Sequence, residues 1–137
     1  MKLLVTTAML LALATGAAQA DSENCRRSRE YLLGTPGGDM ALTPQAYNDL
    51  FKICIATTAM PNVKDAYILR DGGIAVVPKQ DSVSATASTL AQFCDAYPRS
   101  VLRFINRKEK LAIRSVADVA QLSSTSSTPC KKIKGLS

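Results

Sequence analysis

Residues 66–77, AYILRDGGIAVV, decide between two fold classes for this chain. Two apolar runs, 66–69 and 74–77, flank the turn-forming residues Arg-Asp-Gly-Gly, which is the pattern of a β-hairpin. In the alternative interpretation, residues 63–69 form a helical turn and only 74–77 are extended. The sequence therefore predicts a mainly α domain, with or without a short β-hairpin, and an α+β fold is the alternative.

Two helices are predicted before this stretch. The first covers residues 22–33, with Ser22 as its N-cap, and a loop rich in glycine follows it. The second begins with Thr43 as N-cap and Pro44 as its first residue, because proline fits the first helical turn, where its missing N–H is not needed. Apolar residues at helical spacing follow, and Pro61 ends or kinks the helix.

A third helix is predicted after the stretch. Asp81 or Ser82 is its expected N-cap, because a short polar side chain there can accept a hydrogen bond from the first turn. Apolar residues then keep helical spacing on one face. The residue before a proline disfavours helix, so this helix is expected to end near Tyr97, which precedes Pro98.

Residues 100–122 fit either one helix or a pair of strands. As a helix, they place apolar residues on one face and basic residues on another. As strands, 101–105 and 111–116 form a hairpin around 106–110, which the β-branched content favours. The turn lacks glycine, and Ala-Asp-Val-Ala follows, so we expect a helix here.

The basic residues of this segment form a candidate binding face. Such a face could meet an acidic protein or an anionic lipid surface. The simpler interpretation is the solvent-exposed side of an amphipathic helix, which needs no partner. The face consists of Arg99, Arg103, Arg107, Lys108, Lys110 and Arg114.

Residues 1–20 have the layout of a secretory signal peptide. Lys2 gives a positive start, residues 3–14 are uncharged and mostly apolar, and Ala18-Gln19-Ala20 is an A-x-A cleavage pattern. The apolar run is shorter than the roughly 20 residues that a membrane span needs. We therefore expect a cleaved signal peptide and a single exported domain over 21–137, in the bacterial periplasm or secreted.

The exported domain has cysteines at four positions, Cys25, Cys54, Cys94 and Cys130. An even number in an oxidising compartment predicts two disulfides that staple a small domain. A zinc site is not expected, because the chain has neither histidine nor a CxxC spacing. Several connectivities are open, and joining neighbouring elements favours Cys25–Cys54 with Cys94–Cys130.

The composition removes most enzyme chemistry. The chain has no histidine, which excludes Ser–His and Cys–His nucleophile pairs and histidine metal sites. Its acidic residues are scattered singly, and no SxxK motif occurs. We therefore expect no catalytic residue, cofactor or metal. The net charge of +6 favours anionic partners, although an exported chain is not expected to bind nucleic acid.

Three segments resemble the Rap/Tai family of type VI secretion immunity proteins. Residues 50–56, LFKICIA, are similar to the cysteine-containing second helix of that family. Residues 77–98, which begin with Val-Pro and end with LAQFCDAYP, are similar to its next helix. Residues 111–122 with Pro-Cys at 129–130 are similar to its last helix and closing cysteine.

The resemblance implies a small exported helical protein with disulfides that binds and blocks a peptidoglycan-hydrolase toxin. No inhibitory motif of the family is matched, so no inhibitory residue is assigned. The leading hypothesis is therefore a periplasmic protein of immunity or inhibitor type that binds a protein partner. The alternative is an envelope-associated structural or stress protein whose basic face binds anionic lipid or wall polymer.

Overall fold

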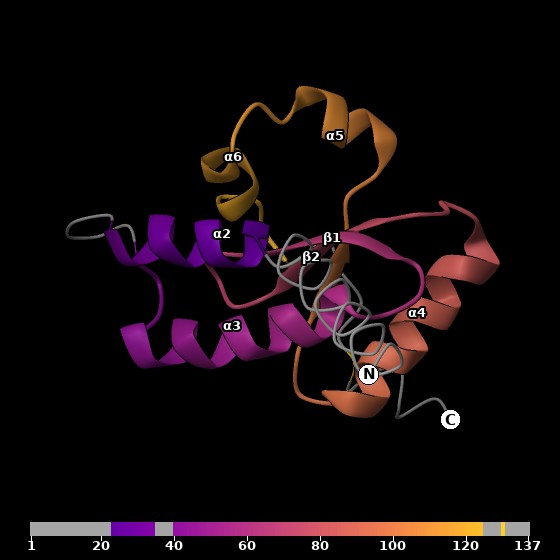
Figure 1. Ribbon diagram of the computed structural model, residues 1–137, viewed down its shortest axis with the longest axis horizontal. Helices are drawn as coiled ribbons and strands as arrows, with labels where there is room; N and C mark the ends of the chain where they lie inside the picture. Colours follow the sequence, from indigo (N-terminus) through magenta and orange to yellow (C-terminus); the bar gives the residue numbers. More distant parts are fainter. Residues whose placement is uncertain (1–22, 35–39, 125–129, 131–137) are drawn as a thin grey trace, which may run out of the picture.

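The computed structural model describes residues 23–34, 40–124 and 130. Within these ranges, five helices surround a three-stranded sheet (Figure 1). The predicted signal peptide and the predicted cap Ser22 lie outside the described residues. The elements are α2 (Glu23–Gly34), α3 (Pro44–Thr58), β1 (Val63–Ile68), β2 (Ile74–Pro78), α4 (Val83–Ala96), β3 (Leu102–Phe104), α5 (Arg107–Ala112) and α6 (Val116–Ala120).

Strands β1 and β2 form the antiparallel hairpin that was one of the two predictions for this stretch. Ile68 lies opposite Ile74, and Leu69 donates its N–H to the carbonyl of Gly73 at 2.9 Å to close the turn. Gly72 has a φ of 102°, a backbone conformation that glycine adopts without steric cost. The hairpin is confirmed, and the fold is α+β rather than mainly α.

The segment 100–122 is not the single helix that its apolar spacing predicted. Its first part forms β3, which lies parallel to β2 with Leu102 opposite Ile74. The strand supplies backbone partners to the edge of β2, and such buried groups need them. Helix resumes only after Asn106, in the two short helices α5 and α6. The alternative hairpin is right about the first strand, but residues 111–116 do not form the second.

The three helices predicted from local signals are confirmed as α2, α3 and α4. Thr43 caps α3, and Pro44 is the first helical residue. Ser82, rather than Asp81, caps α4 and accepts the N–H of Ala85 at 3.2 Å. These helices were predictable because the cap residues act within one turn of chain.

Each face of the sheet has its own core. On one face, the side chains of β1, β2 and β3 pack with helices α2, α3 and α4, and the largest buried side chains there are Tyr47 and Phe93. On the other face, a smaller cluster joins the sheet to Val119 of α6, with Ile113 packed at its border. Helix α5 contributes no buried residue to either core.

Two disulfides join the pairs that the sequence favoured. Cys25–Cys54 links α2 to α3, with their Cα atoms 5.8 Å apart. Cys94–Cys130 ties α4 to the segment that contains residue 130, with a Cα separation of 5.0 Å. All four side chains are buried. Both bonds therefore lie inside the core.

Helix α2 closes the outer edge of β1. Ser28, which is fully buried, accepts the N–H of Ile68 at 2.9 Å and donates its own hydroxyl to the carbonyl of Asn24 at 2.7 Å. The sulfur of Cys25 lies 3.6 Å from the carbonyl of Ala66. The edge of β1 is therefore covered by helix side chains, which prevents a further strand from pairing there.

Candidate functional site

The segment 106–115, here called the basic arm, is exposed at every residue except Glu109 and Ile113, which are half-buried. It contains α5, which stands off from the sheet at the top of Figure 1 between two connecting segments. A capping box starts this helix, because the Asn106 side chain accepts the N–H of Glu109 at 2.7 Å and Glu109 accepts the N–H of Asn106 at 3.3 Å. The cap therefore stabilises this helix, which buries none of its own residues.

The structure divides the basic face that the sequence placed on one helix. Arg99 precedes β3, and Arg103 lies within it. Four of the six residues lie in the basic arm, and all four are exposed. They are Arg107, Lys108, Lys110 and Arg114.

Arg103 is an anchor of the basic arm rather than part of an exposed face. Its guanidinium Nη2 donates to Glu109 Oε2 at 2.6 Å, and only 13% of the Arg103 side chain is exposed. That hydrogen bond lowers the pKa of Glu109 below its usual value. Nε and Nη1 of Arg103 are also buried, and no described residue accepts a hydrogen bond from them. The ion pair thus connects β3 to α5.

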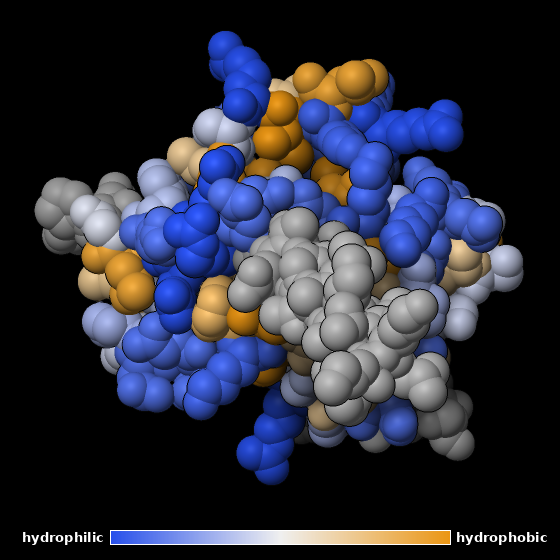
Figure 2. All heavy atoms as spheres, viewed as in Figure 1, coloured by the Kyte–Doolittle hydropathy of each residue, from blue (hydrophilic) through white to orange (hydrophobic). Residues whose placement is uncertain are grey.

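The outer side of the basic arm combines one apolar side chain with several cations. Leu111 is 88% exposed. With Arg107 and Lys110 it lines a hollow whose described lining consists of these three residues. In Figure 2, orange apolar atoms at the top of the view lie among blue hydrophilic side chains in this region. The outer side of the basic arm therefore places one exposed apolar side chain among cations.

A polar cluster lies beside the N-terminal end of α2. Asn24 donates its amide to Asp65 Oδ2 at 2.5 Å and to the Tyr67 hydroxyl at 3.2 Å. Burial raises the pKa of Asp65. Hydrogen bonds from Asn24, Ala66 and Tyr67, together with the charge of Lys110, lower it and partly offset this rise. Burial and the Asp65 charge raise the pKa of Tyr67 to about 12. The cluster joins α2 to β1, and its satisfied hydrogen bonds indicate a structural role.

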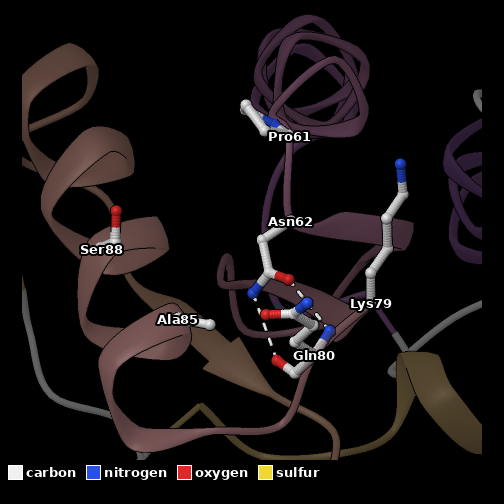
Figure 3. A pocket seen from close by; sticks show the side chains of 6 residues that line it. All are labelled: Pro61, Asn62, Lys79, Gln80, Ala85 and Ser88. Carbon is white, nitrogen blue, oxygen red and sulfur yellow. Dashed lines mark hydrogen bonds between the residues drawn. The ribbon is translucent and has the colours of Figure 1, made fainter.

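A second hollow, of about 330 Å³, lies between α4 and the ends of β1 and β2 (Figure 3). The side chain of Asn62 connects the two sides of this hollow. It accepts the N–H of Gln80 at 2.9 Å and donates to Thr89 Oγ1 at 3.2 Å. Figure 3 shows Lys79 pointing away from Asn62, and Ser88 across the hollow on α4. The hydrogen-bonding atoms of Asn62 hold the strand ends to the helix, so we assign this hollow to the fold.

Two kinds of site are not found in the described part of the chain. No group of three or more His, Cys, Asp or Glu side chains there could hold a metal ion. No helix among residues 23–34 and 40–124 is long and apolar enough to cross a bilayer.

Searches of family models, curated proteins and solved structures find no match to this chain. The resemblance to the Rap/Tai family therefore stays a prediction.

Sequence reasoning identified the cations of the basic arm but missed its anchor and its apolar tip. Glu109 interrupted the apolar stripe of the helix predicted over 100–122, and Leu111 was considered as the first residue of the alternative strand 111–116. A usable signal was present in the Asn-Arg-Lys-Glu spacing of residues 106–109, because a polar cap followed three residues later by glutamate is a helix start. A helix that starts at 106 cannot also pass through 100–105.

Proposed function

We propose that this chain is an exported binding protein of immunity or inhibitor type that holds a protein partner, such as a peptidoglycan-hydrolase toxin, through its basic arm. The supporting observation is a short helix that buries none of its residues yet presents Leu111 at 88% exposure among cations. A helix this short is not stable alone in water. Its cap and the Arg103–Glu109 pair hold it in position, which suits a preformed docking surface.

Leu111 and the cations have different roles in the proposed complex. Full burial of a leucine side chain contributes about 1.5–3 kcal/mol, which is enough for an interface anchor. The surrounding cations are exposed, so they act more on association rate and partner choice than on affinity. The partner therefore offers an apolar recess bordered by acidic residues.

The shape of the basic arm favours a protein partner over a bilayer. Helices that bind membrane interfaces carry an extended apolar face. Helix α5 has only Leu111 and Ala112 as apolar residues among its six. One leucine fits a recess in a protein, whereas a bilayer needs a larger apolar area to retain the chain.

The two disulfides support the proposed compartment. Such bonds persist in oxidising environments and are rare in a reducing cytosol. The signal peptide over 1–20, its cleavage and the resulting domain 21–137 belong to the same proposal, with action in the periplasm or outside the cell. The chain acts by stoichiometric binding, without turnover.

Affinity capture from the periplasm of the native host or a close competitor tests this function. The tagged, oxidised chain is compared with Leu111→Asp and with the double variant Arg107→Glu/Lys110→Glu, and bound proteins are identified by mass spectrometry. Val83→Asp is the matched control, because Val83 is 87% exposed and lies outside the basic arm. We expect one stoichiometric partner that the wild type and the control retain and that both arm variants lose.

The opposing results are equally specific. A partner that all four proteins bind alike would move the docking surface away from the basic arm. Binding to phosphatidylglycerol vesicles, lost in moderate salt and without any protein partner, would replace the proposal with the envelope-surface function, since exposed charge attraction is screened over about 8–10 Å.

A further inference from the structure

The basic arm is an exposed segment whose two ends are fixed in the fold. Ile105, which precedes it, is 2% exposed and donates its N–H to the carbonyl of Val76 at 2.8 Å. Ile113, near its end, packs at the border of the smaller core cluster. Between these two isoleucines, helix α5 buries no residue and stands away from the sheet (Figure 1). The chain between them can therefore open without disturbing either core.

The free-energy cost of opening α5 is low because polar contacts near the surface hold it. They include the capping box between Asn106 and Glu109 and the ion pair of Glu109 with Arg103. No buried side chain of the helix leaves a core when these contacts break. A helix of this length is not stable alone in water. Local unfolding is most frequent in segments that have few buried apolar contacts, so α5 is expected to open before the rest of the fold.

The side chains of the basic arm suit an endoprotease that recognises basic residues. Such an enzyme binds an arginine or lysine side chain in an acidic pocket and cleaves the peptide bond that follows it. Arg107, Lys108 and Lys110 are exposed and lie within the segment that can open. Proteolytic cuts concentrate at exposed segments whose backbone leaves the fold easily.

A second pair of adjacent basic residues has the same chemistry but a different setting. Arg26 and Arg27 are exposed on α2. They lie between Cys25 and Ser28, which are both fully buried. Cys25 is also bonded to Cys54 of α3. Opening this part of α2 would break the main core, so the pair 26–27 serves as a control within the chain.

We propose that the basic arm is a processing site, at which an endoprotease specific for basic residues hydrolyses the peptide bond after Arg107, Lys108 or Lys110. One water molecule adds across the bond, which leaves a carboxylate on the new C-terminus and an amine on the new N-terminus. The cut falls between Cys94 and Cys130, so their disulfide keeps the two fragments in one molecule. This inference goes beyond the proposed function, because it requires no protein partner.

Both fragments retain contacts with the fold after the cut. Strand β3, on the N-terminal fragment, remains paired with β2. On the C-terminal fragment, Ala120 accepts the N–H of Arg70 at 2.8 Å. Ser124 of the same fragment donates its N–H to Asp71 Oδ2 at 2.8 Å. The product is therefore a folded two-chain protein that has lost helix α5.

Limited digestion with trypsin tests the proposal on the oxidised chain. We expect the first cut to lie in the basic arm and to give one species without reductant and two fragments with it. Mass spectrometry assigns the cut, and a cut beyond Cys130 is recognised because it releases a short peptide without reductant. A first cut at the pair 26–27, or cleavage of the arm only when urea unfolds the whole chain, would overturn the proposal.

Two cap variants measure the contribution of local opening. Asn106→Ala removes the cap of α5, so trypsin is expected to cut the arm about fivefold faster than in the wild type, at a urea midpoint close to that of the wild type. Ser82→Ala is the matched control, because it removes the cap of α4 and should leave the cleavage rate of the arm unchanged. Equal cleavage rates in the two variants would show that the arm does not open as proposed.

Recovery of the tagged chain from the periplasm of the native host tests whether the processing occurs there. After reduction, the wild type is expected to give two fragments and the variant Arg107→Gln/Lys108→Gln/Lys110→Gln a single chain. A single intact chain in both samples would refute processing. The two proposals fail separately: if the cut protein still binds the captured partner, docking through the arm is excluded and the processing site stands.

Discussion

Ser28 contributes more to the stability of the fold than a small helix residue usually does. Its hydroxyl is the acceptor for the buried N–H of Ile68. Ser28→Ala is therefore expected to lower the free energy of unfolding by about 1–3 kcal/mol, because that N–H loses its partner. Thr57→Val is the matched control, since Thr57 is also fully buried but donates only to Ile53 of its own helix. Urea denaturation measures both, and an equal loss in the two variants would contradict the assignment.

Asp65 and Glu109 are expected to respond to pH in opposite directions. Because the folded pKa of Asp65 is raised, its contribution is greatest below its unfolded pKa and is lost as the pH rises through the folded pKa. The folded pKa of Glu109 is lowered, so its contribution is present above its unfolded pKa and is lost as the pH falls through the folded pKa.

Substitutions separate these two dependences. Asp65→Asn should remove a fall in unfolding free energy with rising pH, and Glu109→Gln should remove a rise. Urea denaturation at a series of acidic pH values, compared with the wild type, measures the difference. Changes of the same sign in both variants would refute the opposite roles.

At the scale of elements, α5 and α4 depend on their caps to different extents. Asn106→Ala removes a cap that is typically worth about 1 kcal/mol, and α5 has no buried residue to compensate. We expect residues 107–112 to lose helical ¹³Cα shifts while the unfolding midpoint changes little. Ser82→Ala removes the equivalent cap from α4, whose Phe93 is buried, so that helix should persist. Retention of α5 in Asn106→Ala would show that the cap does not hold it.

The elements also differ in how far the sequence predicts them. Helices α3 and α4 follow from Thr43-Pro44 and Ser82, whose effects are local. Strand β3 depends on a parallel neighbour that precedes it by the whole of α4. The apolar residues of this strand also fit helical spacing, and only pairing with the edge of β2 selects the extended form. Non-local pairing of this kind leaves little trace in a three-residue strand.

In the candidate site, too, the features that belong to single residues were predictable, and those that depend on element boundaries were not. The cations of the basic arm are recognisable in sequence because charge is a property of each residue alone. The partial burial of Arg103 and the exposure of Leu111 are not, since both depend on where β3 ends and α5 begins. The misassigned boundary therefore placed Arg103 on an exposed face and left the exposure of Leu111 unpredicted.

For the whole molecule, the two disulfides account for a large share of the expected stability. They close sequence separations of 29 and 36 residues, for which chain entropy predicts about 3–4 kcal/mol each. A domain of this size is typically stable by about 5–15 kcal/mol. Cys25→Ala/Cys54→Ala and Cys94→Ala/Cys130→Ala should each lower the urea midpoint, and all four substitutions together should leave the chain largely unfolded. A fully substituted chain with the wild-type midpoint would contradict this.

The order of the two disulfides along the chain bears on how it matures. Cys25 pairs with the next cysteine along the chain, Cys54, and Cys94 pairs with the one that follows it, Cys130. Neither bond therefore encloses or crosses the other. A chain that emerges from a translocon amino end first meets each correct thiol before a wrong one is available. Thiol–disulfide exchange to repair mispaired intermediates is then unnecessary. Under the proposed export, pairing of the cysteines in the order in which they emerge would give both native bonds.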